Sequence, residues 1–199
     1  MGFLKKLFGW EKQPTLAPSG GAEKRFKKRV ASTKGSFIER ASIAGLMMAI
    51  QADEVAEQRT QLTPDHQLVF MMGYECCMMW AIKSGIEKVL KPEQVQSALL
   101  AMKRYLAQHG WYEPEAFEKI WAQTKVMMPI AMNTRYGPDA PPPYPIAEML
   151  IGLDQAGYSL PMAEKVKLSD VRFGLHMFGV MVNLTRASRS AAQDPLQSK

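Results

Sequence analysis

The sequence predicts an all-α protein, and three observations support this prediction. Apolar residues recur at steps of three and four in several segments, which is the period of an amphipathic helix. Helix-start signals precede these segments. No segment alternates apolar and polar residues with a period of two, and no Asn-Gly or Asp-Gly hairpin turn occurs. We therefore expect a single irregular bundle of about six helices with a flexible amphipathic and basic N-terminal arm.

The length and composition are those of one folded domain with extensions. The chain has 199 residues, of which 47% are apolar and 22% charged, close to ordinary globular usage. We divide it into an arm at residues 1–35, an all-α domain at residues 36–188 and a disordered tail at residues 189–199. The longest apolar run, residues 68–82, is interrupted by Glu75 and is too short to cross a bilayer.

Two helices open the predicted domain. Ser36 and Glu39 have the spacing of a capping box, which predicts a helix over about residues 37–59. Thr63 stands before a proline and predicts a second helix that runs to about residue 90. The middle of this second helix is apolar on nearly every face, so we expect it to be the buried centre of the domain.

Four further segments carry helical patterns. Residues 92–109 and 114–128 each begin at a proline, and Pro129 ends the second because proline lacks the backbone N–H that a helix interior needs. A proline-rich loop at residues 133–145 precedes a short helix that stops at Gly157. Ser169-Asp170 then starts the last helix. The predicted inward faces follow in chain order. They are Val95, Leu99, Met102 and Leu106 in the helix at 92–109, and Phe117, Ile120, Trp121, Thr124 and Met128 in the helix at 114–128. In the short helix they are Ile146, Met149, Leu150 and Leu153, and in the last helix Val171, Leu175, Phe178, Met181 and Val182.

The first ten residues, MGFLKKLFGW, form an amphipathic pattern. On a helix at 100° per residue, five large apolar side chains lie within an arc of about 160° and two lysines lie outside it. The apolar residues are Phe3, Leu4, Leu7, Phe8 and Trp10, and the lysines are Lys5 and Lys6. Such a pattern is typical of a segment that lies in a membrane interface.

Positive charge is concentrated in the same arm. Up to Arg40 the chain has 10 Lys and Arg against 3 Asp and Glu, a net +7, and beyond Arg40 it has 15 against 16, a net −1. Prolines and glycines at residues 14–21 predict a flexible linker, and a basic run follows at residues 23–34. The overall charge of +6 therefore describes the arm and not the domain.

Magnitudes favour a membrane as the target of the arm. Burying one large apolar side chain gains about 1.5–3 kcal/mol and ordering one residue costs about 1–2 kcal/mol. For the decapeptide alone, the free energy of burial and the cost of ordering therefore nearly cancel. Each basic residue near an anionic leaflet adds about 1 kcal/mol. The alternatives are a mobile terminus, a helix that docks on its own protein, a solvated basic face and a nucleic-acid-binding arm. Nucleic acid is the weaker of the functional alternatives because the domain has no recognisable reading element.

Two features of the predicted central helix resemble sites. Met72, Cys76 and Met79 form a stripe of soft sulfur ligands that suits Cu(I), but methionine and free cysteine also fill cores, and core packing is the favoured interpretation. Glu75 is a charge within an apolar run. We expect it to pair with a Lys or Arg of another helix or to line a polar cavity, and a pocket near Glu75 and Tyr74 is the third hypothesis, an enzyme or ligand carrier.

The sequence contains no recognisable catalytic constellation. His66, His109 and His176 are scattered, and the motifs of di-iron, zinc-hydrolase, serine-hydrolase and nucleotide sites are missing. We expect a protein that is not an enzyme and has no cofactor or metal. Adjacent Cys76 and Cys77 favour a reducing compartment, and the first residues lack the features of a secretory signal.

The resulting prediction is a non-enzymatic, Met-rich adaptor or scaffold at the inner face of the cytoplasmic membrane. Its helical domain binds other proteins of a membrane-associated assembly, and its arm binds the anionic membrane surface; the alternative is a nucleic-acid-associated protein that uses the same arm. The predicted membrane-binding residues are Phe3, Leu4, Lys5, Lys6, Leu7, Phe8, Trp10, Arg25, Lys27, Lys28 and Arg29.

Overall fold

The computed structural model describes residues 28, 32–33, 35–56, 62–109, 114–133 and 144–193. Within these residues the chain forms seven helices and no strand, which confirms the all-α prediction. The helices are α3 (Phe37–Val55), α4 (Pro64–Ile86), α5 (Pro92–His109), α6 (Pro114–Asn133), α7 (Tyr144–Gln155), α8 (Met162–Leu168) and α9 (Val171–Ala192).

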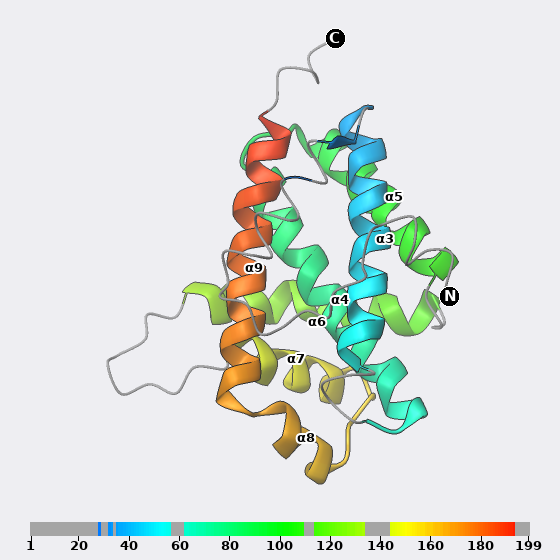
Figure 1. The fold of residues 1–199 in the computed structure, drawn as a ribbon, viewed down its shortest axis with the longest axis vertical. Helices are drawn as coiled ribbons and strands as arrows, with labels where there is room; N and C mark the ends of the chain where they lie inside the picture. Colours follow the sequence, from blue (N-terminus) through cyan, green and yellow to red (C-terminus); the bar gives the residue numbers. More distant parts are fainter. Residues whose placement is uncertain are drawn as a thin grey trace.

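Helix α4 is the centre of the fold (Figure 1). Every residue from Phe70 to Ile82 is buried, as expected for a helix that is apolar on all sides. It contacts α3, α5, α6, α7 and α9. In the same view α3 and α9 stand on either side of it, and α8 lies at the end of the molecule opposite the first turn of α3.

Two glycines permit close contacts between helices. A Cβ atom at Gly85 of α4 would lie 2.3 Å from the carbonyl oxygen of Thr185 in α9, and one at Gly45 of α3 would lie 3.0 Å from the carbonyl oxygen of Met102 in α5. The α4–α9 contact is reinforced by the Thr185 hydroxyl, which donates to the Ala81 carbonyl at 3.0 Å. At Gly85 the two backbones approach so closely that only glycine leaves enough space, and at Gly45 a Cβ atom would be in tight contact with the α5 backbone.

The predicted capping box starts the domain. The Ser36 backbone N–H donates to Glu39 Oε2 at 2.5 Å, and the Glu39 N–H donates to Ser36 Oγ at 3.3 Å. Gly35 precedes it with φ at 135°, a backbone conformation that residues other than glycine rarely adopt. These residues fix the direction in which α3 begins.

The inward faces predicted for α5 and α6 are confirmed, because all of their residues are buried. The predicted end of α6 is wrong: the helix continues through Pro129 to Asn133. Proline removes one backbone hydrogen bond here, and burial of Met128 and Ala131 on either side of it keeps the last turn in place. Tertiary contacts thus override the local signal.

Three further features differ from the prediction: one helix, one helix end and one helix face. Helix α8 is absent from the predicted elements because its seven residues are too few for a periodic pattern to be recognised. Residues 189–192, predicted to belong to the tail, form the last turn of α9. The predicted inward face of α9 is wrong at Val171 and Leu175, which are exposed, whereas Gly174 and Met177 are buried.

Candidate functional site

The predicted membrane-binding residues fall almost entirely outside the described residues. Lys28 alone is described, and it is exposed. The other ten are Phe3, Leu4, Lys5, Lys6, Leu7, Phe8, Trp10, Arg25, Lys27 and Arg29, so the anchor remains a prediction from the sequence.

Glu75 is fully buried at the centre of α4. Among the residues that the structure describes, neither of its carboxyl oxygens has a hydrogen-bond partner, and no ion pair reaches it. Burial raises the pKa of this carboxyl from 4.5 to about 8 because the charged form loses its hydration. The carboxyl is therefore mostly protonated at neutral pH, and the expected pairing with a Lys or Arg is not found in the described part of the chain.

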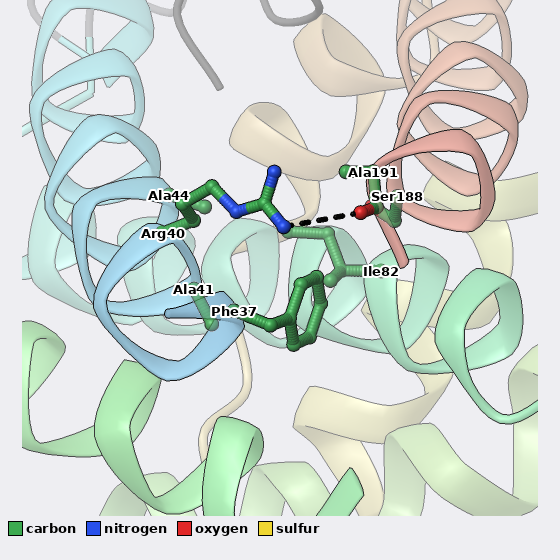
Figure 2. A pocket seen from close by; sticks show the side chains of 7 residues that line it. All are labelled: Phe37, Arg40, Ala41, Ala44, Ile82, Ser188 and Ala191. Atoms are coloured by element: carbon green, nitrogen blue, oxygen red, sulfur yellow. Dashed lines mark hydrogen bonds between the residues drawn. The ribbon is translucent and has the colours of Figure 1, made fainter. Parts of the chain in front are cut away.

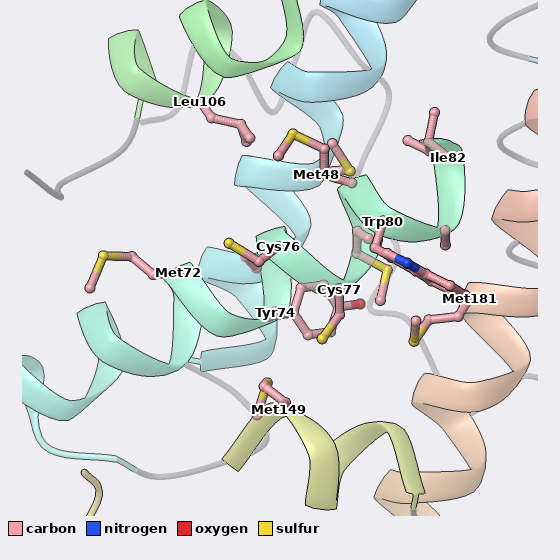
Figure 3. Packing of buried hydrophobic residues seen from close by; sticks show 14 of the residues in the cluster. Met48, Met72, Tyr74, Cys76, Cys77, Trp80, Ile82, Leu106, Met149 and Met181 are labelled. Atoms are coloured by element: carbon pink, nitrogen blue, oxygen red, sulfur yellow. The ribbon is translucent and has the colours of Figure 1, made fainter. Parts of the chain in front are cut away.

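The sulfur stripe lies inside the core (Figure 3). Met72, Cys76 and Met79 are all buried, and Figure 3 shows Cys76 and Cys77 among Met48, Met149 and other core side chains. Cys76 Sγ lies 4.0 Å from the carbonyl oxygen of Phe117. Burial raises the pKa of both thiols, so both stay protonated at neutral pH.

No group of three or more His, Cys, Asp or Glu side chains in the described residues is arranged to hold a metal ion. The three sulfur atoms of the stripe come from successive turns of a single helix, so closing a coordination sphere around Cu(I) at this place needs a rearrangement of the core. Filling space between α4 and its neighbours is the role that the geometry gives these residues.

A small hollow lies between α3, α4 and α9 (Figure 2). It is partly open to solvent, has room for about one water molecule, and is lined by Phe37, Arg40, Ala41, Ala44, Ile82, Ser188 and Ala191. The Arg40 guanidinium is buried and donates from Nη2 to the Ala191 carbonyl at 3.3 Å, and it lies 5.9 Å from the centre of the Phe37 ring. A cation at the carbonyl end of α9 is electrostatically favourable, so Arg40 ties the start of α3 to the end of α9.

His66 connects the start of α4 to α8. Its Nδ1 atom lies 2.8 Å from Thr63 Oγ1 and 2.6 Å from Oε2 of the buried Glu164. The contact with Thr63 is a hydrogen bond whose direction depends on the ring tautomer, whereas the contact with Glu164 is within ion-pair distance but lacks the geometry of a hydrogen bond. No local pattern in the sequence indicates that a residue almost 100 positions away in the chain contacts it.

Helix α8 differs from an ordinary surface helix, because it buries a polar side chain and exposes two apolar ones. Its inward side presents the polar Glu164 together with Leu168, while Met162 and Val166, one turn apart, point outward with 73% and 63% of their surface exposed. On the next helix, Val171 is 48% and Leu175 49% exposed. We call Met162, Val166, Val171 and Leu175 the α8–α9 corner.

Two of the three cations near the α8–α9 corner are paired with aspartates. Lys165 Nζ lies 2.8 and 2.6 Å from the two carboxylate oxygens of Asp154, and Arg172 Nη2 lies 3.2 Å from Asp170 Oδ2. These contacts lower the pKa values of both aspartates through hydrogen bonds from the cations. The third cation, Lys167, is exposed, so exposed apolar side chains and a lysine occur together on this part of the described surface.

None of the described helices is long and apolar enough to span a bilayer. No family model, curated protein sequence or solved structure matches the chain.

Proposed function

We propose that the protein is a non-enzymatic peripheral-membrane adaptor, a single irregular helical bundle whose arm holds it at the cytoplasmic face of an anionic membrane. The observation that carries the proposal is the decapeptide at residues 1–10, in which five large apolar side chains fall on one side and two lysines on the other. Apolar insertion and attraction to anionic lipid act together in such a segment, and neither is sufficient alone.

The division between arm and domain supports this proposal. The net +7 lies within the first 40 residues, and the rest of the chain has a net charge of −1. The domain begins with its own capping box at Ser36, immediately after Gly35. An arm that precedes a separately capped domain can bind a surface without unfolding the domain.

The membrane part of the proposal is tested with vesicles of zwitterionic and anionic phospholipid. The full-length protein is expected to float with the vesicles, and deletion of residues 1–12 is expected to release it. A Leu16→Ser variant is the matched control, because it removes an apolar side chain from the arm outside the decapeptide. Retained flotation after the deletion would contradict the proposal.

The same arm could serve nucleic acid, and the two targets respond differently to loss of apolar side chains. Replacement of Phe3, Leu7 and Phe8 by Ser leaves every positive charge in place. Membrane binding is expected to be lost in this triple variant. Salt-sensitive retention on DNA or RNA that survives the triple replacement, without vesicle binding by the wild type, would assign the arm to nucleic acid instead.

The adaptor part rests on exposed apolar side chains in the domain. Val126 and Ile130, one turn apart on α6, are 61% and 58% exposed. We expect a protein partner that co-purifies with the full-length chain from detergent-solubilised membranes to be lost in Val126→Ser/Ile130→Ser, while the helical content of this variant is unchanged. An identical set of partners for the two proteins would contradict the assignment of this face.

A further inference from the structure

We propose that α8 and α9 form a second membrane-contact surface, which lies on anionic phospholipid and sets the orientation of the domain. We call it the α8–α9 face; it consists of the α8–α9 corner together with the exposed cations Lys167, Arg186 and Arg189. The inference rests on the proposed membrane function, because it names the part of the described domain that meets the lipid.

The positive charge of the chain after Arg40 is concentrated in α8 and α9. Residues 162–192 contain five Lys and Arg against two Asp and Glu, a net charge of +3. The other residues after Arg40 contain 10 Lys and Arg against 14 Asp and Glu, a net charge of −4. One of the two acidic residues of the segment, Glu164, is buried beside His66. The segment is therefore complementary in charge to an anionic surface, and the rest of the domain is not.

Three cations of this segment are available to lipid headgroups. Lys167, Arg186 and Arg189 are exposed, and none of the ion pairs formed among the described residues includes them. Helix α9 contains no Asp or Glu from Val171 to Ala192. Lysine and arginine side chains in such a setting bind the phosphate oxygens of anionic headgroups.

On α9 the exposed apolar and basic residues share one side of the helix, which lies along one side of the molecule (Figure 1). At about 100° per residue, they fall within an arc of about 60°. These residues are Val171, Leu175, Arg186 and Arg189, and the fully buried Met177 lies on the opposite side. A flat membrane can therefore contact the apolar and the basic residues of α9 at the same time.

On α8 two apolar side chains occupy the centre of the outward side, with a lysine to either side of them. Val166 and Met162 are 63% and 73% exposed and lie about 40° apart around the helix axis. Lys165 and Lys167 lie about 100° from Val166 in opposite directions. Lys165 is bound to Asp154, whereas Lys167 can reach headgroup phosphates while the apolar side chains beside it enter the interface.

This combination of side chains favours lipid over the other classes of partner. Nucleic acid would bind the cations and leave the four apolar side chains of the corner in water. An uncharged apolar protein surface would cover the corner and leave the cations without partners. The interface of an anionic bilayer accommodates both, because acyl chains and phosphates lie within a few ångströms of each other there.

Insertion is measured in the full-length protein with a fluorophore whose emission shifts to shorter wavelength in an apolar environment. The label is attached at Val166→Cys or at Leu175→Cys, and at Val126→Cys on α6 as the control, since Val126 is 61% exposed. Cys76 and Cys77 are fully buried and do not compete for the label. An N-terminal hexahistidine tag holds each protein on vesicles that contain a nickel-chelating lipid, so the readout does not depend on the affinity of the arm.

On tethering vesicles of zwitterionic and anionic phospholipid, we expect a shift to shorter wavelength at Val166 and Leu175 and an emission as in water at Val126. Emission as in water at Val166 or Leu175 would overturn the proposal. Vesicles without the nickel-chelating lipid test the arm separately. If the labels insert only on tethered protein, the anchor fails and the α8–α9 face stands; if the protein binds without the tether and both labels stay in water, the anchor stands and the face fails.

The charge requirement is tested by partition of untagged protein onto the same anionic vesicles. Arg186→Gln/Arg189→Gln is expected to bind about thirtyfold more weakly than the wild type, since each basic residue near an anionic leaflet strengthens binding about fivefold. Lys91→Gln/Arg104→Gln removes two exposed cations at α5 and is the matched control, expected to bind within about twofold of the wild type. Equal weakening by the two variants would show an effect of net charge alone and would contradict the α8–α9 face.

The apolar requirement and the other occupants are tested with Met162→Ser/Val166→Ser. This variant is expected to partition at least about tenfold more weakly than the wild type, and circular dichroism verifies that it is folded. Unchanged partition would contradict insertion of α8. A wild-type dimer that this variant dissolves would show that a second copy of the chain covers the face, and that result would also overturn the proposal.

Discussion

The buried carboxyl of Glu75 should make the protein less stable as pH rises, and Glu75→Gln should remove this effect. In the native protein the carboxyl remains protonated up to a pKa of about 8, whereas in the unfolded chain it ionises near 4.5. Between these values the native state binds one proton more than the unfolded state. Stability therefore falls with increasing pH, which is opposite to the behaviour of a carboxylate in a salt bridge.

The size of the effect follows from the two pKa values. Each tenfold change in the ionisation constant corresponds to about 1.4 kcal/mol, so the shift from 4.5 to about 8 amounts to about 5 kcal/mol once the pH exceeds both values. Between about pH 5 and pH 8 the change is about 3–4 kcal/mol, because ionisation of the unfolded chain has already begun at pH 5. Glutamine has nearly the same shape and no proton to lose.

Urea unfolding of the wild type and Glu75→Gln at a series of pH values measures this directly. We expect similar stabilities near pH 5 and a difference of about 3–4 kcal/mol in favour of the variant near pH 8. Glu115→Gln is the matched control, since the Glu115 side chain is 82% exposed, and it should follow the wild type. A pH-independent difference between the wild type and Glu75→Gln would refute the reasoning.

Three other experiments test the packing. Gly85→Ala should lower the free energy of unfolding by about 1–3 kcal/mol, because the new Cβ atom would lie 2.3 Å from the Thr185 carbonyl oxygen. Gly152→Ala is the control and should raise the free energy of unfolding by about 0.5–1 kcal/mol, because its Cβ atom would contact only Gln123, at 3.7 Å. Equal effects of the two substitutions in urea unfolding would contradict the close α4–α9 contact. Ser36→Ala should cost about 0.5–2 kcal/mol in the same assay through loss of the N-cap, and an unchanged midpoint would argue against the capping box. Both cysteine thiols should be unreactive toward a thiol reagent in the native protein and reactive in concentrated guanidinium, and a fast native reaction would contradict their burial.

The local signals in the sequence predicted much of the helical structure. The capping box at Ser36 and the prolines that open α4, α5 and α6 mark helix starts through backbone geometry alone, so no knowledge of the fold is needed to interpret them. The unbroken apolar surface of α4 likewise predicted its central position.

The predictions from the sequence are wrong where contacts between distant segments of the chain determine the local structure. Pro129 lies within α6 because the burial of its neighbours outweighs one lost hydrogen bond, and Val171 and Leu175 are exposed because Gly174 and Met177 take the inner side of α9. In α8, Glu164 lies on the inward side with Leu168, within ion-pair distance of His66 on α4. No periodic pattern in seven residues could have indicated that contact.

The α8–α9 corner could not be predicted from the sequence, for a related reason. Met162 and Val166 look like core residues until the inward position of Glu164 is known. The arm presents the opposite case, because its apolar and basic residues are evident in the sequence and lie, except for Lys28, outside the described residues.

The most direct measurement of the central claim is the partition of the wild type and Phe3→Ser/Leu7→Ser/Phe8→Ser onto the same anionic vesicles. Each large apolar side chain contributes about 1.5–3 kcal/mol when inserted, so we expect the triple variant to partition at least about a thousandfold more weakly at unchanged net charge. Equal partition of the two proteins would contradict it.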